Sequence, residues 1–183
     1  ICKFISETFY EDRLQPEPHT QNRMIRLPDD GGSIVTVEAG IVFVPVKHEG
    51  NVQGSDEEAE MILDIVDELI GRDITDKEGN ICRQVTIHND ILFVTPYNLQ
   101  VRKLTHLLPE GARVASVDKF QGQEAPIVII SMCASPGEFG SRGMGFLLDK
   151  NRLNVAVSRA QSLTIIVGDP RLVETNCTSI SNM

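Results

Sequence analysis

With 183 residues, the chain is long enough for one domain with a sizeable core and too short for two full domains. Its hydrophobic (41%) and charged (23%) fractions are ordinary for a globular protein, and no apolar run approaches the ~20 residues of a membrane-spanning helix. The net charge of −9 means that the chain as a whole repels the negatively charged backbone of a nucleic acid. Between Tyr97 and Arg171, however, nine Lys or Arg stand against six Asp or Glu, which is compatible with a local cationic face.

The cysteines argue against a metal centre or a disulfide framework. The four residues (Cys2, Cys82, Cys133 and Cys177) are far apart and form no Cys-x-x-Cys pair, so we expect no metal site. The N-terminus also lacks the charged-then-apolar pattern of a signal peptide. These features favour a reducing compartment, and we expect a cytoplasmic protein without membrane contact.

The first forty residues are weakly patterned, with an amphipathic helix expected over 1–14 and a turn-rich stretch after it. From residue 41 the pattern sharpens, because "IVFVPV" (41–46) is typical of a buried strand. Ser55 and Glu58 then form a Ser-x-x-Glu capping box, followed by apolar residues at helical spacing that end at Gly71. We expect residues 71–90 to form a connecting loop.

Four more buried strands are predicted at 91–95, 113–117, 126–131 and 163–168. Helical patterns over 98–108 and about 150–161 lie between some of them. Strands that are buried on both faces and separated by helices indicate an α/β fold with a mostly parallel sheet. In such sheets, ligands gather at the carboxyl ends of the strands.

The glycines exclude a self-contained P-loop ATPase. None of the 14 glycines is followed by lysine, so nothing supplies the amide cradle and the phosphate-binding lysine of that motif. "GSRGMG" (140–145) does not follow a strand pattern, and we interpret it as a flexible connector.

The remaining candidate functional residues lie in three segments that contain polar side chains. They read "VTPYNLQV", "ASVDKFQGQEAPIVIIS" and "GFLLDKNRLNVAVSRAQSLTIIVGDPRLV". In the third, Arg159 is the only charge among mainly apolar residues from 153 to 161, which suggests a guanidinium held beside a buried surface. Taken one at a time, such residues are more often structural than catalytic, so their joint occurrence and order carry the interpretation.

These three segments closely resemble motifs IV, V and VI of superfamily 1 helicases. Their amino-acid sequences are especially similar to those of bacterial proteins that fuse a RecB-like nuclease to such a helicase. The resemblance runs from Ile41 through Leu172. It implies a RecA-like three-layer fold for 41–183, as the second of two RecA-like domains. It also implies that residues 1–40 continue from an upstream domain and that both ends of the chain are cut.

The resemblance implies that ATP with Mg²⁺ is bound mainly by the first RecA-like domain, which would be this chain's partner. Arg159 matches the arginine finger that contacts the γ-phosphate. Tyr97 matches a residue that stacks on adenine, with Gln100 nearby. Gly122 would let the backbone approach the nucleotide or the partner domain, and Glu124 matches the position that bonds the ribose.

The same resemblance implies contact with a nucleic acid, expected to be DNA, and allows for a fused nuclease domain. Ser116 and Lys119 match positions that touch the nucleic-acid backbone. Many relatives have Arg where Gln123 stands, so a second cation is absent here. Asp169 belongs to the last sheet strand and its turn, and we do not expect it to be catalytic.

Two other function classes compete with an ATP-driven helicase or translocase domain. One is a catalytically inactive RecA-like module that binds nucleic acid or a partner without ATP turnover. The other is a small-molecule enzyme on a doubly wound sheet, for which the sequence offers no nucleophile–base pair or cofactor loop.

We predict that this chain alone hydrolyses ATP no faster than a buffer blank, because it has no P-loop lysine. Phosphate release by the purified chain measures this. Turnover that persists in contaminant-free protein after Arg159→Ala would contradict the assignment to a second motor domain.

Overall fold

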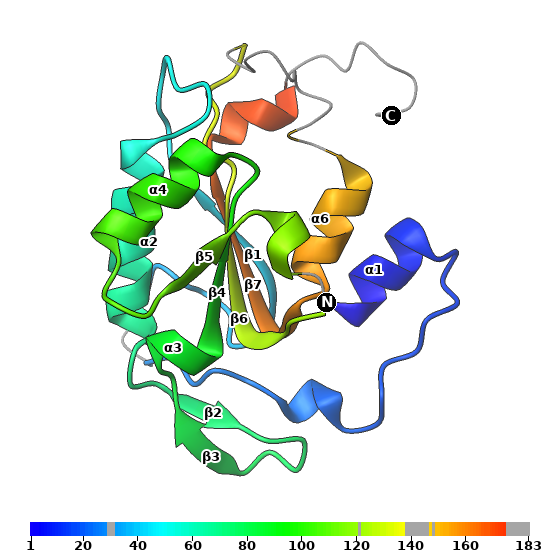
Figure 1. Cartoon of the computed structure of the whole chain (residues 1–183). Coiled ribbons are helices and arrows are strands. Elements are labelled where there is room, and N and C mark those ends of the chain that lie inside the picture. Colours follow the sequence, from blue (N-terminus) through cyan, green and yellow to red (C-terminus); the bar gives the residue numbers. More distant parts are fainter. Residues whose placement is uncertain (29–31, 121, 138–146, 148, 175–183) are drawn as a thin grey trace.

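The computed structural model describes residues 1–28, 32–120, 122–137, 147 and 149–174 (Figure 1). Its centre is a five-stranded sheet in the order β1-β7-β6-β4-β5, in which every neighbouring pair is parallel. The predicted α/β, RecA-like architecture is therefore confirmed. The strands are β1 (Gly40–Pro45), β4 (Ile91–Val94), β5 (Arg113–Ala115), β6 (Ala125–Ser131) and β7 (Ala160–Gly168).

Helices cover both faces of this sheet and make three layers (Figure 1). One face carries α2 (Asp56–Leu69), α3 (Ile87–Asp90) and α4 (Asn98–Leu107). The other carries α1 (Cys2–Phe9), α6 (Lys150–Val157) and the 3₁₀ turns η2 (Val117–Phe120) and η4 (Pro170–Glu174). Within the described residues, no helix combines the length and apolar character needed to cross a bilayer.

Two hydrophobic cores follow from the alternation of side chains along the central strands. In β4, Ile91 and Phe93 enter the core beneath α2 and α4, while Leu92 and Val94 enter the core beneath α6. The same alternation holds along β6. Because successive side chains of a strand point to opposite faces, continuous apolar runs are what a sheet covered on both sides requires.

Residues 71–90 are not the expected loop. They form an antiparallel hairpin of β2 (Asp73–Thr75) and β3 (Ile81–Gln84), followed by α3. Asp76 closes the turn, because its Oδ1 accepts from the amides of Glu78 and Asn80 at 3.0 and 2.9 Å. The strands are short, and all of β3 is exposed. The sequence therefore has no buried apolar run from which this hairpin could be predicted.

The N-terminal segment packs on this hairpin. Ile25 bridges to Ile74 in β2 and is fully buried in the core beneath α2. The Thr75 hydroxyl accepts from the amide of Met24 at 2.8 Å. The weakly patterned first forty residues thus contribute to the same core as the sheet. The expected helix over 1–14 is shorter, because α1 ends at Phe9.

Two element boundaries differ near the polar motifs. The helix expected over 150–161 ends at Val157, and β7 begins at Ala160 rather than at 163. The cause is sheet pairing, because Ala160 pairs with Ala125 and the Arg159 carbonyl accepts from the Ala125 amide at 3.0 Å. The connector predicted at 140–145 lies outside the described residues.

A matched pair of isoleucines tests the core. Ile129→Ala should destabilise the chain by about 2–5 kcal/mol, because this 1%-exposed side chain would leave a cavity between the sheet and its helices. Ile81→Ala, at a residue that is 63% exposed, should cost well under 1 kcal/mol. Urea unfolding of both variants measures the difference, and equal losses would contradict the core assignment.

Candidate functional site

The residues singled out by the motifs lie at two opposite edges of the sheet. Because β4 and β6 are parallel, Tyr97 and Gln100 follow β4 at the carboxyl edge, whereas Gly122 and Glu124 precede β6 at the amino edge. β6 has seven residues, which separates the two edges by about 20 Å at ~3.3 Å per residue. Arg159 precedes β7, so it lies at the amino edge with Glu124.

The amino edge brings Glu124 and Arg159 together. The residues after them, Ala125 and Ala160, are register partners in the parallel ladder. Glu124 is exposed, and its Oε2 accepts a long hydrogen bond of 3.4 Å from Gln161 Nε2. Gly122 is also exposed and adopts a φ of +83°, a backbone conformation that L side chains rarely take. This edge therefore presents a carboxylate, a guanidinium and a glycine turn to the outside.

Arg159 lies in the turn after α6 rather than within a helix. Its Nε donates to the Val155 carbonyl at 3.1 Å, and its Nη2 donates to Ser158 Oγ at 3.1 Å. The side chain is half-buried, and among the described residues no carboxylate forms an ion pair with it. The guanidinium is thus anchored by neutral groups of its own helix end.

Tyr97 and Gln100 are buried in this structure. Tyr97 is 3% exposed and packs in the core beneath α6. Gln100 is fully buried; its Oε1 accepts from the Ser55 amide at 2.9 Å, and its Nε2 donates to the Ser55 carbonyl and to Ser131 Oγ, both at 3.0 Å. The Gln100 side chain thereby joins α4 to the start of α2 and the end of β6.

Ser116 and Lys119 lie on the connection from β5 to β6. Ser116 is half-buried and Lys119 is exposed, with the Lys119 amide donating to the Ser116 carbonyl at 3.0 Å. Phe120 is buried beneath α6, and Asp118 pairs with Arg152 of α6 at 3.6 Å. The segment therefore lies against α6 with its lysine directed to solvent.

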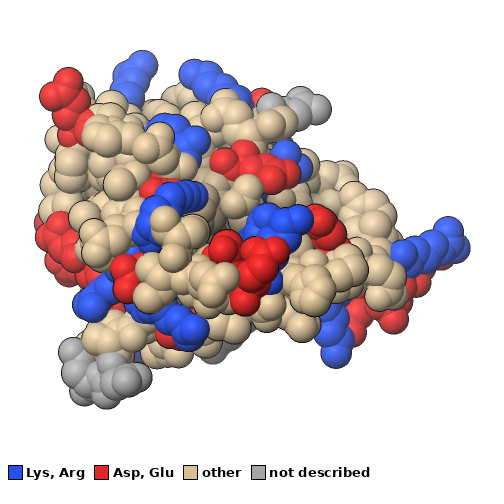
Figure 2. All heavy atoms as spheres, turned by 90° about the horizontal axis from the view of Figure 1, so that it is seen from below, with Lys and Arg blue, Asp and Glu red and all other residues tan. Residues whose placement is uncertain are grey.

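The surface seen from below Figure 1 shows basic and acidic side chains interspersed rather than separated into a basic face (Figure 2). The charge balance of the C-terminal half therefore does not produce a cationic area on this side. Any contact with nucleic acid on this face would depend on individual cations rather than on a broad field.

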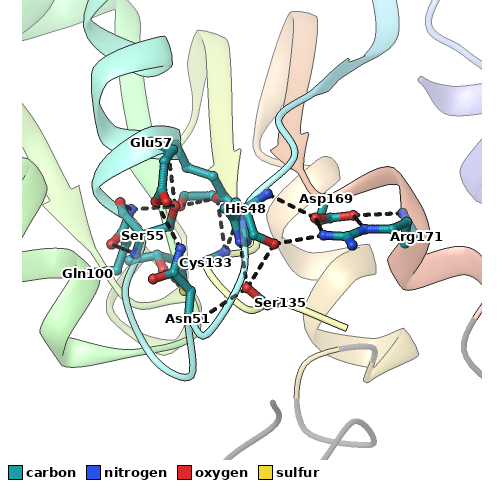
Figure 3. A network of polar contacts seen from close by, with 12 residues as sticks. His48, Asn51, Ser55, Glu57, Gln100, Cys133, Ser135, Asp169 and Arg171 are labelled. Carbon is teal, nitrogen blue, oxygen red and sulfur yellow. Dashed lines mark hydrogen bonds and ion pairs between the residues drawn. The ribbon is translucent and has the colours of Figure 1, made fainter. Parts of the chain in front are cut away.

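A buried polar network at the carboxyl edge was not predicted from the sequence (Figure 3). The Ser55 half of the expected capping box is confirmed, because Ser55 Oγ accepts from the Glu58 amide at 3.0 Å. The Glu58 carboxylate, however, turns into the interior. It accepts from His48 Nε2 at 2.9 Å, from Ser131 Oγ at 2.7 Å and from the Cys133 amide at 2.9 Å. Nothing in the local pattern distinguishes such a glutamate from an ordinary cap.

His48 extends the network from Glu58 to the segment after β6. Its Nδ1 lies 2.8 Å from Ser135 Oγ, which also accepts from the Asn51 amide at 3.0 Å. Burial alone lowers the pKa of His48, but the hydrogen bond and negative charge of Glu58, together with the charges of Glu57 and Asp169, outweigh burial and raise it. A buried carboxylate opposite a protonated imidazole is the arrangement that compensates both charges.

Asp169 and Arg171 attach the end of β7 to this network. Asp169 Oδ2 accepts from the His48 amide at 3.1 Å and from Arg171 Nη2 at 2.7 Å. The hydrogen bonds from Arg171 hold the pKa of Asp169 well below its ordinary value. Asp169 is 1% exposed, and its hydrogen bonds join the end of β7 to the segment after β1.

The linked Ser135, His48 and Glu58 have the chemical types of a nucleophilic relay, yet all three are buried, Ser135 being 2% exposed. A substrate would have no access to the Ser135 oxygen, so the cluster joins segments rather than performing acyl transfer. Among the described residues, no group of His, Cys, Asp and Glu could hold a metal ion.

The parallel sheet between two helical layers is an α/β, RecA-like fold. The family model described as "AAA domain" matches residues 1–171, and the chain belongs to that family.

Comparison with curated proteins identifies helicases of several kinds. DNA polymerase alpha-associated DNA helicase A of Schizosaccharomyces pombe is 30% identical over 181 residues, covering 95% of this chain and 27% of that protein. An uncharacterized ATP-dependent helicase of Methanocaldococcus jannaschii is 29% identical over 190 residues, covering 95% of this chain and 25% of that protein. Human RNA helicase Mov10l1 is 38% identical over 92 residues, covering 46% of this chain and 8% of that protein.

These relatives support a superfamily 1 helicase-type domain, as the motifs suggested. The chain spans about a quarter of the length of the first two. None of the three is bacterial, so they do not support the expected similarity to bacterial nuclease–helicase fusions.

The His48–Glu58 pair should make stability depend on pH. Because the folded-state pKa of His48 is raised above its ordinary 6.5, its contribution is fully present below pH 6.5 and is lost as pH rises through the folded-state pKa. His48→Gln should flatten this slope and cost about 3–5 kcal/mol below pH 6.5, since it leaves Glu58 buried without its cation.

Urea unfolding of the chain between pH 5.5 and 9 measures this effect. His106→Gln is the matched control, because His106 is exposed at the end of α4 and should leave the slope unchanged. Equal pH slopes in the wild-type chain and in His48→Gln would contradict the charged pair.

Proposed function

We propose that the chain is the second motor domain of an ATP-dependent superfamily 1 helicase or translocase. The observation that carries this proposal is the position of Glu124 and Arg159 at the amino edge, immediately before two neighbouring strands of the sheet. Both belong to the motifs that resemble this superfamily, and the relatives are named as helicases.

Arg159 is proposed as the arginine finger. During phosphoryl transfer, negative charge spreads over the equatorial oxygens, and an arginine that contacts them is worth roughly 10³–10⁵ in rate. A planar, permanently charged guanidinium suits this task better than an ammonium group. Its anchoring by a carbonyl and a hydroxyl supports the proposal, because a carboxylate partner would have neutralised it.

The nucleotide would lie between this chain and a first RecA-like domain. That domain would supply the P-loop and the carboxylates for Mg²⁺, since no glycine of this chain is followed by lysine. Here the exposed Glu124 would accept from the ribose hydroxyls, and the open turn at Gly122 would let the backbone approach. ATP bound in this way supplies the phosphoryl group that is transferred to water.

We do not extend direct nucleotide contact to Tyr97 and Gln100. Both side chains are buried, and both follow β4 at the edge opposite Glu124. To reach a ligand, Gln100 would have to break three hydrogen bonds within the domain. We therefore propose that these two residues hold α4 in place.

The nucleic acid is proposed to contact the segment of Ser116 and Lys119, with DNA as the expected form. Lys119 supports this, because it is exposed on a segment held against α6. The named relatives include helicases of DNA and of RNA, so both polymers belong in a binding assay. A fused nuclease domain and a cytoplasmic location stay predictions from the sequence.

An inactive RecA-like binding module is the second candidate; both candidates agree with the absence of a P-loop lysine in this chain, so that absence does not separate them. ATP turnover by the full-length protein that contains this chain separates the two. Turnover stimulated by nucleic acid supports the motor, and nucleic-acid binding without turnover supports the binding module.

Arg159→Lys in that full-length protein should lower ATP turnover by about 10²-fold or more, because lysine keeps the charge but loses the planar fork. Nucleic-acid affinity and the melting temperature should change little. Arg152→Lys, on α6 shortly before the turn that carries Arg159 and paired with Asp118, is the matched control and should retain turnover within a few-fold. Normal turnover with a depressed melting temperature would instead identify Arg159 as a structural residue.

A further inference from the structure

The end of α6 holds Arg159 through a hydroxyl that bridges two groups. Ser158 Oγ donates to the Val155 carbonyl at 3.0 Å and accepts from Arg159 Nη2 at 3.1 Å. The same Val155 carbonyl accepts from Arg159 Nε at 3.1 Å. Carbonyl, hydroxyl and guanidinium therefore form a closed triangle of hydrogen bonds.

This triangle occupies one edge of the guanidinium. Nε and Nη2 form its lateral edge, where their two N–H bonds point in the same direction. Of the five N–H groups of an arginine, two are used in this way, and the other three donate no hydrogen bond to the described residues. The end edge, formed by Nη1 and Nη2, is a second fork of parallel N–H groups that can bind two phosphate oxygens at once.

Local physics favours this arrangement. The last carbonyls of a helix lack partners within the helix and carry partial negative charge, so a cation at this position is stabilised. Ser158 is the C-cap residue of α6, and its amide donates to the Asn154 carbonyl at 2.9 Å, which fixes the backbone that carries the hydroxyl. The hydroxyl is thus fixed before any ligand arrives.

We propose that Ser158 is a positioning residue for the finger: it holds the lateral edge of Arg159 and leaves the end edge free for phosphate oxygens. This inference rests on the proposed function of Arg159. A flexible arginine would lose rotamer freedom each time it met the transition state, and Ser158 removes part of that cost beforehand. Its effect should therefore appear in turnover and not in the binding of ADP.

The test uses the full-length protein with Ser158→Ala, Ser158→Thr and Arg159→Ala. Steady-state ATPase assays give kcat and KM, and titrations give the Kd of ADP with and without aluminium fluoride, which mimics the transferring phosphoryl group. Ser158→Ala should lower kcat about tenfold, as expected for one hydrogen bond to a charged group, with KM nearly unchanged. It should weaken ADP–aluminium fluoride binding by a similar factor and leave ADP binding unaltered. Ser158→Thr keeps the hydroxyl and should restore both quantities to within about twofold.

Ser162→Ala is the matched control, because Ser162 is a buried serine of β7 that forms no hydrogen bond with Arg159. If Ser158→Ala does not fold, Ser158→Cys replaces it, since a thiol is a poor acceptor of similar size. A lowered melting temperature with an unchanged ratio of the two Kd values would make Ser158 a simple cap and overturn the inference.

The two proposals fail in different ways. In one outcome, Arg159→Ala abolishes ATP turnover and the tighter binding of ADP in the presence of aluminium fluoride, while Ser158→Ala changes neither. That result supports Arg159 as the arginine finger and contradicts the positioning role of Ser158. If Arg159→Ala also changes neither, both fall.

Discussion

The buried carboxylate of Glu58 is the interaction on which the carboxyl edge of the sheet depends. A carboxylate withdrawn from water is tolerated only when its oxygens are hydrogen-bonded and its charge is compensated. Glu58 meets both conditions with donors from three places: His48 after β1, Ser131 at the end of β6 and Cys133 beyond it. Since β7 lies between β1 and β6, and Asp169 after β7 accepts from the His48 amide, one network fixes where three neighbouring strands leave the sheet.

With one edge of the sheet fixed in this way, the opposite edge can present chemistry without long loops. Glu124 and Arg159 each stand immediately before a strand, and the residues that follow them are register partners. Neighbouring strands lie about 4.8 Å apart, so the sheet itself determines the spacing of the two backbones. Only the directions of the side chains need further contacts. For Arg159, hydrogen bonds to Val155 and Ser158 orient the guanidinium. A site built on strand ends is held more precisely than one built on flexible loops.

The central sheet could be predicted because several of its strands are continuous apolar, β-branched runs between turn residues; β6 is buried at every residue. The β2–β3 hairpin could not, because β3 is exposed throughout and its pairing depends on the turn at Asp76. The predicted end of α6 was too close to the C-terminus, because the helical pattern of apolar residues runs through Ala160. In the structure Ala160 pairs with Ala125 in the sheet, and the helix ends before it. Motif resemblance identified Arg159 and Glu124, whose grouping the sheet register supports, but it could not show that Tyr97 and Gln100 lie at the other edge.

Gln100 illustrates why a polar residue within a motif need not touch a ligand. Its amide satisfies both backbone groups of Ser55, the residue that caps α2, and also donates to Ser131. Ser131 in turn donates to Glu58, so a continuous chain of hydrogen bonds joins α4 to the strand ends through α2. Each of these groups would be left buried without a partner if the Gln100 side chain were removed, which costs about 1–3 kcal/mol per group. A position can therefore require glutamine for reasons internal to the domain, and its effect on a distant nucleotide would then pass through the placement of α4 and the sheet.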